Sequence, residues 1–125
     1  MIKLFSLISG IIFISACAPH DQRYYYQHPQ ALQEALIACQ NQSVEDVHCQ
    51  KLKPVARNIN KLAYKLQSDP QKFGLDIIEL EANLVQKQTD YKRNPSADNQ
   101  KDIEQLKATL EHHLAIVKWL ESPQA

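Results

Sequence analysis

The sequence predicts a small all-α domain that carries one disulfide and follows a cleaved export signal. Its composition favours helices, because glycine occurs only twice in 125 residues while alanine, leucine, lysine, glutamine and glutamate are plentiful. Apolar residues recur every three or four positions in four segments, which is the period of an amphipathic helix. No useful stretch alternates with the period of a strand. We expect a bundle of four helices, or of five if Pro54 breaks the second.

The start of the chain has the parts of a secretion signal. Lys3 supplies a positive charge, and Leu4 to Ile14 forms a mostly apolar run. That run has about eleven residues, whereas a membrane-spanning helix needs about 20, so a signal peptide fits better than an anchor. Cleavage before Cys17, after Ser15-Ala16, would make this cysteine the lipidated first residue of a bacterial lipoprotein.

A second cleavage site competes with this one. An ordinary signal peptidase could read Ala16-Cys17-Ala18 as an A-x-A site and cut after Ala18. Pro19 would then follow the scissile bond, and its fixed φ and missing N–H suit it poorly to that position. We therefore expect residues 1–16 to be the signal peptide and Cys17 to be lipidated, with an uncleaved anchor as the least favoured alternative.

The expected lipid also predicts a location. Several acyl chains on Cys17 would hold the chain on a membrane through hydrophobic burial alone. Ala18, rather than aspartate, would be the second mature residue. By resemblance to lipoprotein sorting in Gram-negative bacteria, this implies the outer membrane, with the chain facing the periplasm.

Lipidation of Cys17 leaves Cys39 and Cys49 as a pair in an oxidising compartment. A disulfide between them would close a loop of about eleven residues and stabilise the domain by about 2.5–3 kcal/mol. The alternative, two buried free thiols, is less favoured in a small exported chain.

Residues 17–27 are expected to form the lipidated N-terminus and a tether, followed by a helical domain over 28–125. In the tether, Tyr24, Tyr25 and Tyr26 form a candidate interaction surface. They could lie at the membrane interface or dock onto the domain. We prefer that one or two of them cover the core, because isolated aromatic side chains rarely stay exposed.

The first two helices are predicted on either side of a turn at residues 41–43. The first begins near Pro29, a residue suited to the first helical position. A weak capping box of Ser43 and Asp46 starts the second, whose apolar stripe runs from Val44 to Leu66. Pro54 interrupts this stripe, so we expect a kink or a break just before it.

The third helix should begin at Asp69-Pro70, a carboxylate N-cap followed by proline. Gly74 weakens its first turn by up to about 1 kcal/mol, and we expect close packing to be the reason for it. The last helix should follow a cap at Ser96 and stop at Ser122-Pro123. The third helix has a core stripe, widened by two further residues: Phe73, Ile77, Leu80 and Leu84, then Ile78 and Val85.

These stripes have near-heptad spacing, so they could also form a coiled-coil seam with a second molecule. An antiparallel bundle that buries its own core is the preferred interpretation for helices joined by short loops.

The sequence predicts no enzyme, no metal site and no cofactor. No two of the five histidines have the i,i+4 spacing of a helical zinc site, and adjacent His112 and His113 should point to the core edge and to solvent. Asp90-Tyr91-Lys92 is a D-x-K triplet, but nucleases carry that motif on a β-sheet. The full chain has a net charge of zero, so no global basic field indicates nucleic-acid binding.

Two groups of residues carry resemblances to known families. The first group is Tyr25-Tyr26-Gln27-His28-Pro29, Leu32, Ala35, Cys39-Gln40-Asn41, Cys49 and Ala56. It resembles the entry-exclusion lipoproteins of conjugative plasmids, which are linked to blocking redundant transfer. This chain departs from them by continuing through two further helices.

The second group spans nearly the whole domain: the same cysteines, Asp69-Pro70-Gln71-Lys72-Phe73-Gly74, Ile116-Val117 and Glu121-Ser122-Pro123. It resembles small uncharacterised lipoproteins of gammaproteobacterial intracellular pathogens, some of which are labelled secreted endonucleases. The resemblance implies a fold and a location but no activity.

Taken together, these features predict a lipid-anchored helical module that interacts with an envelope protein and has no catalytic activity. An entry-exclusion-like lipoprotein and a metal-dependent nuclease are the alternatives.

Overall fold

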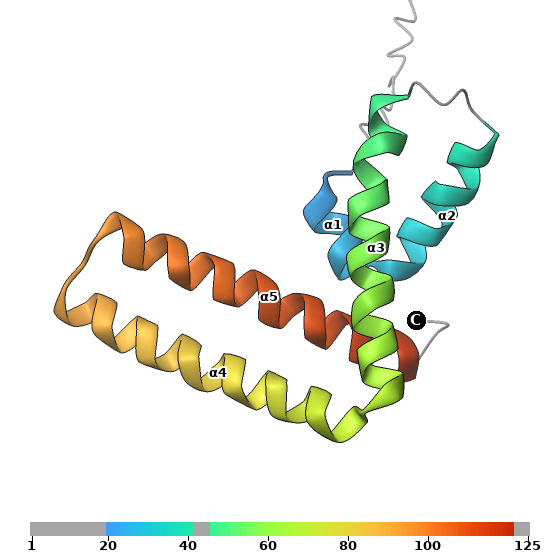
Figure 1. Ribbon diagram of the computed structural model, residues 1–125. Coiled ribbons are helices and arrows are strands. Elements are labelled where there is room, and N and C mark those ends of the chain that lie inside the picture. Colours follow the sequence, from blue (N-terminus) through green and yellow to red (C-terminus); the bar gives the residue numbers. More distant parts are fainter. Residues whose placement is uncertain (1–19, 42–45, 122–125) are drawn as a thin grey trace, which may run out of the picture.

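The computed structural model describes residues 20–41 and 46–121, and this part of the chain contains five helices and no strand. The helices are α1 (Gln22–Gln27), α2 (Pro29–Gln40), α3 (Val47–Ser68), α4 (Pro70–Arg93) and α5 (Ala97–Glu121), as Figure 1 shows. The predicted all-α fold is therefore confirmed. Among the described residues, no helix is both long and apolar enough to cross a membrane. The predicted signal peptide and Cys17 lie outside the described residues.

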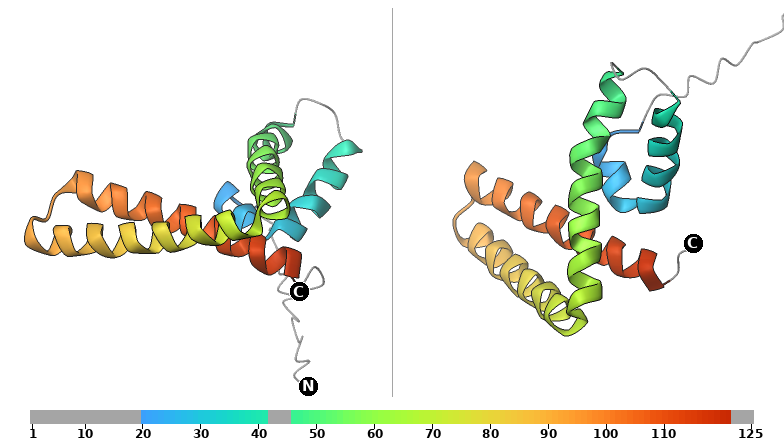
Figure 2. Two further views of the ribbon diagram at one scale, coloured as in Figure 1. Left: turned by 60° about the horizontal axis from the view of Figure 1, so that its bottom comes forward. Right: turned by 45° about the vertical axis from the view of Figure 1, so that its right-hand side comes forward.

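Helix α3 is the centre of the molecule. Helices α1 and α2 pack against its N-terminal half, and α4 and α5 form a long antiparallel hairpin that projects away from it (Figures 1 and 2). The C-terminal part of α5 returns across α3 and contacts α1 and α2 as well. Of the other described helices, α3 and α5 are the two that contact α4.

The main core lies where α1, α2, α3 and the end of α5 meet. Residues from all four helices are buried there, and the side chain of Ile116 on α5 is completely buried. A domain of this size has little core, so each of these side chains matters to its stability. The buried members of this core are Tyr25, Leu32, Leu52, Val55, Ile59 and Ile116.

The disulfide joins the C-terminal end of α2 to the N-terminal end of α3. Cys39 and Cys49 are bonded with their sulfur atoms 2.05 Å apart, as the sequence predicts. The bond therefore closes the connection that includes residues 42–45, which lie outside the described part of the chain.

Residues 22–27, which the sequence assigned to the tether, form helix α1 and pack against the rest of the domain. Asp21 caps this helix by accepting a hydrogen bond from the backbone N–H of Tyr24 at 2.9 Å. His28 then ends α1, and Pro29 begins α2 at the expected position. The fifth helix therefore comes from this segment and not from a break at Pro54.

Helix α3 passes through Pro54 without a break, although the sequence favoured a kink or a break there. Pro54 costs the helix one backbone hydrogen bond, and the burial of Leu52 and Val55 on either side of it holds the helix together at this position. The N-cap is Asp46, whose side chain accepts from the backbone N–H of His48 at 2.9 Å. The predicted cap Ser43 and stripe residue Val44 lie outside the described residues.

The hairpin begins and turns where the sequence predicts. Asp69 caps α4 by accepting from the backbone N–H of Lys72 at 2.9 Å, with Pro70 at the first helical position. Ser96 accepts from the backbone N–H of Asn99 at 3.1 Å at the start of α5. One expectation is wrong: a Cβ added to Gly74 would meet no atom within 4 Å, so close packing does not explain this glycine.

Candidate functional site

Every histidine in the chain lies against an aromatic ring. His20 and His28 stack on either side of Tyr24, with ring centroids 3.7 and 4.2 Å away. On the other side of the fold, His112 stacks on Tyr26 at 4.0 Å, and His113 lies 4.9 Å from Phe73. The fifth pair is His48 and Tyr25, at 6.0 Å. Each imidazole is therefore held in place by an aromatic side chain of the same chain.

The three tyrosines of the predicted interaction surface therefore have different positions. Tyr25 is buried in the main core and is not available to a partner. Tyr24 is half-buried between its two histidines. Only Tyr26, also half-buried, lines an open groove. The expectation that one or two of the three cover the core is confirmed, while the surface itself is reduced mainly to Tyr26.

The groove lies between α3 and α5 and has a volume of about 330 Å³. We name it the α3–α5 groove. Such a volume is at the lower end of the range for sites that hold small molecules. Its walls come from three helices: Tyr26 from α1, Asn58, Lys61, Leu62 and Lys65 from α3, and Thr109, His112 and His113 from α5.

Hydrogen bonds fix the polar groups of this groove. The side-chain amide of Asn58 donates to the hydroxyl of Tyr26 at 2.7 Å. Nδ1 of His113 lies 2.8 Å from the backbone carbonyl oxygen of Thr109. A carbonyl oxygen only accepts, so Nδ1 carries the proton of the neutral imidazole and Nε2 is left for another partner.

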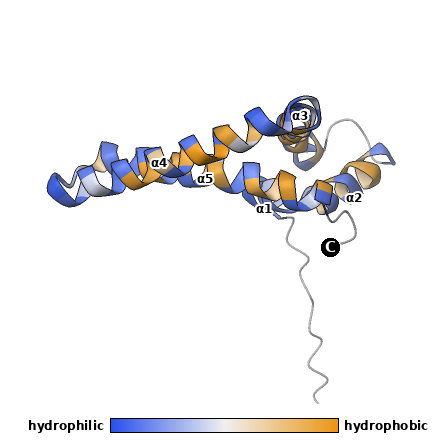
Figure 3. Ribbon diagram, turned by 90° about the horizontal axis from the view of Figure 1, so that it is seen from below, coloured by the Kyte–Doolittle hydropathy of each residue, from blue (hydrophilic) through white to orange (hydrophobic). Residues whose placement is uncertain are grey.

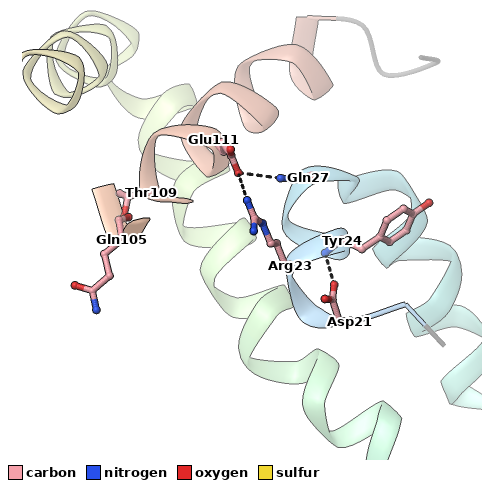
Figure 4. Close-up of polar contacts among 7 residues, drawn as sticks. All are labelled: Asp21, Arg23, Tyr24, Gln27, Gln105, Thr109 and Glu111. Carbon is pink, nitrogen blue, oxygen red and sulfur yellow. Dashed lines mark hydrogen bonds and ion pairs between the residues drawn. The ribbon is translucent and has the colours of Figure 1, made fainter. Parts of the chain in front are cut away.

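Among the described residues that line the α3–α5 groove, the ionisable groups with a formal charge at neutral pH are all positive. Its lining includes two lysines and two histidines but no carboxylate. Lys61 and Lys65 are exposed, and neither forms an ion pair with any described residue. Glu111 lies beside His112 in sequence, but it turns toward α1, where it accepts from Gln27 at 2.9 Å and pairs with Arg23 at 3.4 Å (Figure 4). Among the described residues, the permanent charges of the groove are therefore the two ammonium groups of Lys61 and Lys65.

This charge belongs to a wider pattern on α3. The helix carries five basic residues and no acidic one, although the whole chain has equal numbers of both. Sequence reasoning missed it because it used the net charge of the chain, whereas the signal was local. The five residues are Lys51, Lys53, Arg57, Lys61 and Lys65.

The surroundings of His112 shift its pKa. Burial lowers its pKa from the usual value of 6.5, and repulsion by His113 and Arg23 lowers it further, while Glu111 acts in the opposite direction. His112 and His113 are both half-buried, so the predicted division between core edge and solvent is not found. Each instead packs on an aromatic ring at the edge of the groove.

A second surface lies on the outer face of α4. Leu75, Ile78, Ala82 and Val85 follow one another at spacings of three, four and three, which places them along one side of the helix. We name these four residues the α4 outer stripe. Its three large members are 59%, 61% and 63% exposed, respectively. The prediction that Ile78 and Val85 widen the core stripe is therefore wrong.

The other face of α4 explains this arrangement. Phe73 is buried, and Ile77, Leu80 and Leu84 are partly buried on the side that packs along α5. Lys87 reinforces this contact with an ion pair to Asp102 of α5 at 2.9 Å. The stripe lies on nearly the opposite side of the helix, since its positions are about 150° away at 100° per residue. Figure 3 shows apolar segments recurring along α4 between polar ones.

The residues considered for nuclease chemistry do not form a centre. Asp90 is exposed near the end of α4, three residues before its last residue Arg93. Among the described residues, no three histidine, cysteine, aspartate or glutamate side chains lie in a group that could hold a metal ion.

Comparison of the chain with protein-family models, with curated proteins and with solved structures finds no match. Two surfaces of the described part of the chain are the candidates for function, the α3–α5 groove and the α4 outer stripe.

Proposed function

We propose that this chain is a lipid-anchored helical module of the bacterial cell envelope that binds another envelope protein through the α4 outer stripe and has no catalytic role. The observation that carries the proposal is the exposure of Leu75, Ile78 and Val85 along one side of α4. The alternative functions are an entry-exclusion lipoprotein, which would use the same stripe, and a nuclease.

The spacing of the stripe favours a helix as its partner. Single exposed apolar side chains are ordinary, but a row at heptad positions matches the pattern by which one helix packs against another. Among the described helices, α4 contacts α3 and α5 alone, and the stripe lies on its exposed side. Burial of the three large side chains would contribute a few kcal/mol, at about 25 cal/mol per Å² of apolar surface.

The charged residues beside the α4 outer stripe indicate which kind of partner helix would bind there. Glu79 and Glu81 flank the middle of the stripe on its two sides, and both are exposed. Neither forms an ion pair with a described residue. A partner helix with lysine or arginine beside its apolar row would complement these carboxylates. A second copy in an antiparallel pair centred on the stripe would instead bring Glu79 against Glu79 and Glu81 against Glu81.

The membrane part of the proposal depends on Cys17. The apolar run before Ile14-Ser15-Ala16-Cys17 supports export and lipidation. Mass spectrometry of the mature N-terminus should find acylated Cys17, and C17S should move the chain from the membrane fraction to the soluble periplasm. An unmodified N-terminus at Pro19 would contradict lipidation without bearing on the stripe.

Site-specific cross-linking tests the stripe. A photo-reactive residue at position 78 should form a covalent product in cells with one envelope protein, at a basic amphipathic helix identified by mass spectrometry. The same residue at position 105, which is Gln105 on the exposed surface of α5, is the matched control and should give no such product. A product with a second copy, or none, would contradict the proposed partner.

Binding in solution then decides whether the cross-link reports a real interface. A synthetic peptide of the identified helix should bind the detergent-purified full chain, and the triple change L75Q/I78Q/V85Q should weaken it about a hundredfold. The change I37Q/V47Q removes two apolar side chains that are 60% and 64% exposed elsewhere, and should have no effect. Glu79→Lys with Glu81→Lys should also weaken binding, and reversed charges on the peptide should restore it.

A further inference from the structure

We propose that the α3–α5 groove is a binding site for a phosphomonoester group. The site is separate from the proposed protein-binding surface, because the groove and the α4 outer stripe share no residue. The ligand class follows from the side chains that line the groove and from their hydrogen bonds.

The groove presents permanent positive charge without a partner. Lys61 and Lys65 lie one helical turn apart on α3, and no carboxylate lines the groove beside them. Two ammonium groups match the two negative charges of a phosphomonoester, and charge-assisted hydrogen bonds of this kind are about twice as strong as neutral ones. A neutral or cationic ligand would leave this charge uncompensated.

The opposite wall supplies an ordered imidazole. His113 uses Nδ1 to donate to the carbonyl oxygen of Thr109 and packs on Phe73, so its ring is held in place. Nε2 is the ring nitrogen left for a ligand. The two lysines on α3 and this histidine on α5 thus line the groove from two sides.

The volume favours a phosphate that is attached to something larger. A space of about 330 Å³ exceeds what a bare inorganic anion fills, and small-molecule sites begin near this size. The stacked rings of Tyr26 and His112 and the side chain of Leu62 give the groove an apolar part for the remainder of the ligand. The phosphate could belong to a soluble metabolite or to a lipid headgroup, because both present the same chemistry.

Lysine protection provides a test with residue resolution. The detergent-purified full chain is treated with an acetylating reagent, with and without glycerol 3-phosphate, and acetylation is read at each lysine by mass spectrometry. Lys61 and Lys65 should be protected, while Lys53, an exposed lysine of the same helix outside the groove, should not. Glycerol should protect none of them. No protection by either glycerol 3-phosphate or the phosphatidic acid vesicles described below, or equal protection of all three lysines, would overturn the proposal.

A second arm distinguishes the sources of the phosphate. The chain is reconstituted in phosphatidylcholine vesicles with or without phosphatidic acid, whose headgroup is a phosphomonoester. Protection of Lys61 and Lys65 only by phosphatidic acid would identify a lipid ligand, and protection only by glycerol 3-phosphate a soluble one. Protection by a DNA oligonucleotide that extends to Lys51 and Lys53 would overturn the site in favour of nucleic-acid binding by the whole basic helix.

Isothermal titration calorimetry measures how much Lys61 and Lys65 contribute to the affinity for the ligand. The change K61Q/K65Q should weaken binding of the ligand identified above about tenfold or more, since it removes two charge-assisted hydrogen bonds. The matched change K53Q should leave the affinity unaltered. Both variants alter exposed side chains, so unchanged circular dichroism should confirm that the fold is retained. Equal affinities for K61Q/K65Q and the unaltered chain would overturn the proposal.

Discussion

Tyr26 of α1 stacks on His112 of α5, with ring centroids 4.0 Å apart and ring planes inclined by 14°. The hydroxyl of the same tyrosine accepts a hydrogen bond from Asn58 of α3. One side chain therefore connects three helices that lie far apart in the sequence. Glu111 strengthens this connection from the neighbouring position through Arg23 and Gln27.

Replacement of Tyr26 should separate the two contributions of this side chain. Tyr26→Phe loses only the bond from Asn58 and should lower the free energy of unfolding by about 1 kcal/mol. Tyr26→Ala also loses the stack and should cost about 2 kcal/mol or more. Urea denaturation followed by circular dichroism measures both. Equal losses for the two variants would show that the ring stack contributes nothing.

Gly74→Ala should stabilise the protein. This residue is in the first turns of α4, has no positive φ, and leaves open space where a Cβ would lie. Alanine should therefore raise the free energy of unfolding by about 0.5–1 kcal/mol through its higher helix propensity.

The exposed residue Ala82 on the same helix supplies the matched control for Gly74. Ala82→Gly should lower the free energy of unfolding by a similar amount, because the helix propensities act in the opposite direction. A loss of stability in Gly74→Ala would indicate that the glycine serves the helix in another way.

Local signals predicted most of the helix boundaries. Asp69 and Pro70 act through hydrogen bonds and backbone angles within one turn, so their effect can be read from neighbouring residues. Helix α1 was missed for the opposite reason. Six residues are too few to form a stable helix alone, and this one is held by the burial of Tyr25 against residues distant in sequence.

The α4 outer stripe and the α3–α5 groove were harder to predict than the helix boundaries, because both depend on contacts between residues that lie far apart in the sequence. Both apolar rows of α4 are visible in its sequence, but only packing against α5 decides that Phe73 is buried and Ile78 is exposed. The α3–α5 groove combines Lys61 with His113, residues that no spacing rule connects. The absence of acidic residues from α3 was the one local signal that could have indicated it.

Loss of the disulfide should destabilise the domain moderately. The cysteines are ten residues apart in sequence, and closing so short a loop in the unfolded chain accounts for about 2–3 kcal/mol. The double change C39S/C49S should lower the urea midpoint accordingly while circular dichroism remains helical, because the buried core residues belong to other positions. An unchanged midpoint would mean that the connection is already ordered without the bond.

The stability of the protein should fall as the pH is lowered past the titration range of His112. Its pKa in the folded chain lies below the unfolded value of 6.5, mainly because burial disfavours the charged form. The unfolded chain therefore binds more protons in this range, and folding loses stability as the pH falls from about 7.5 toward the lower folded pKa. Above the unfolded value the contribution is fully present.

A variant isolates this contribution from other titrating groups. The difference in unfolding free energy between the unaltered chain and His112→Gln should be larger near pH 7.5 than near pH 5, since the other groups titrate alike in both. The measurement needs a buffer without phosphate, because an anion in the groove would favour protonated His112 and reduce the effect. A difference that grows as the pH falls would mean that the folded chain stabilises the protonated imidazole, contrary to the effect of its burial.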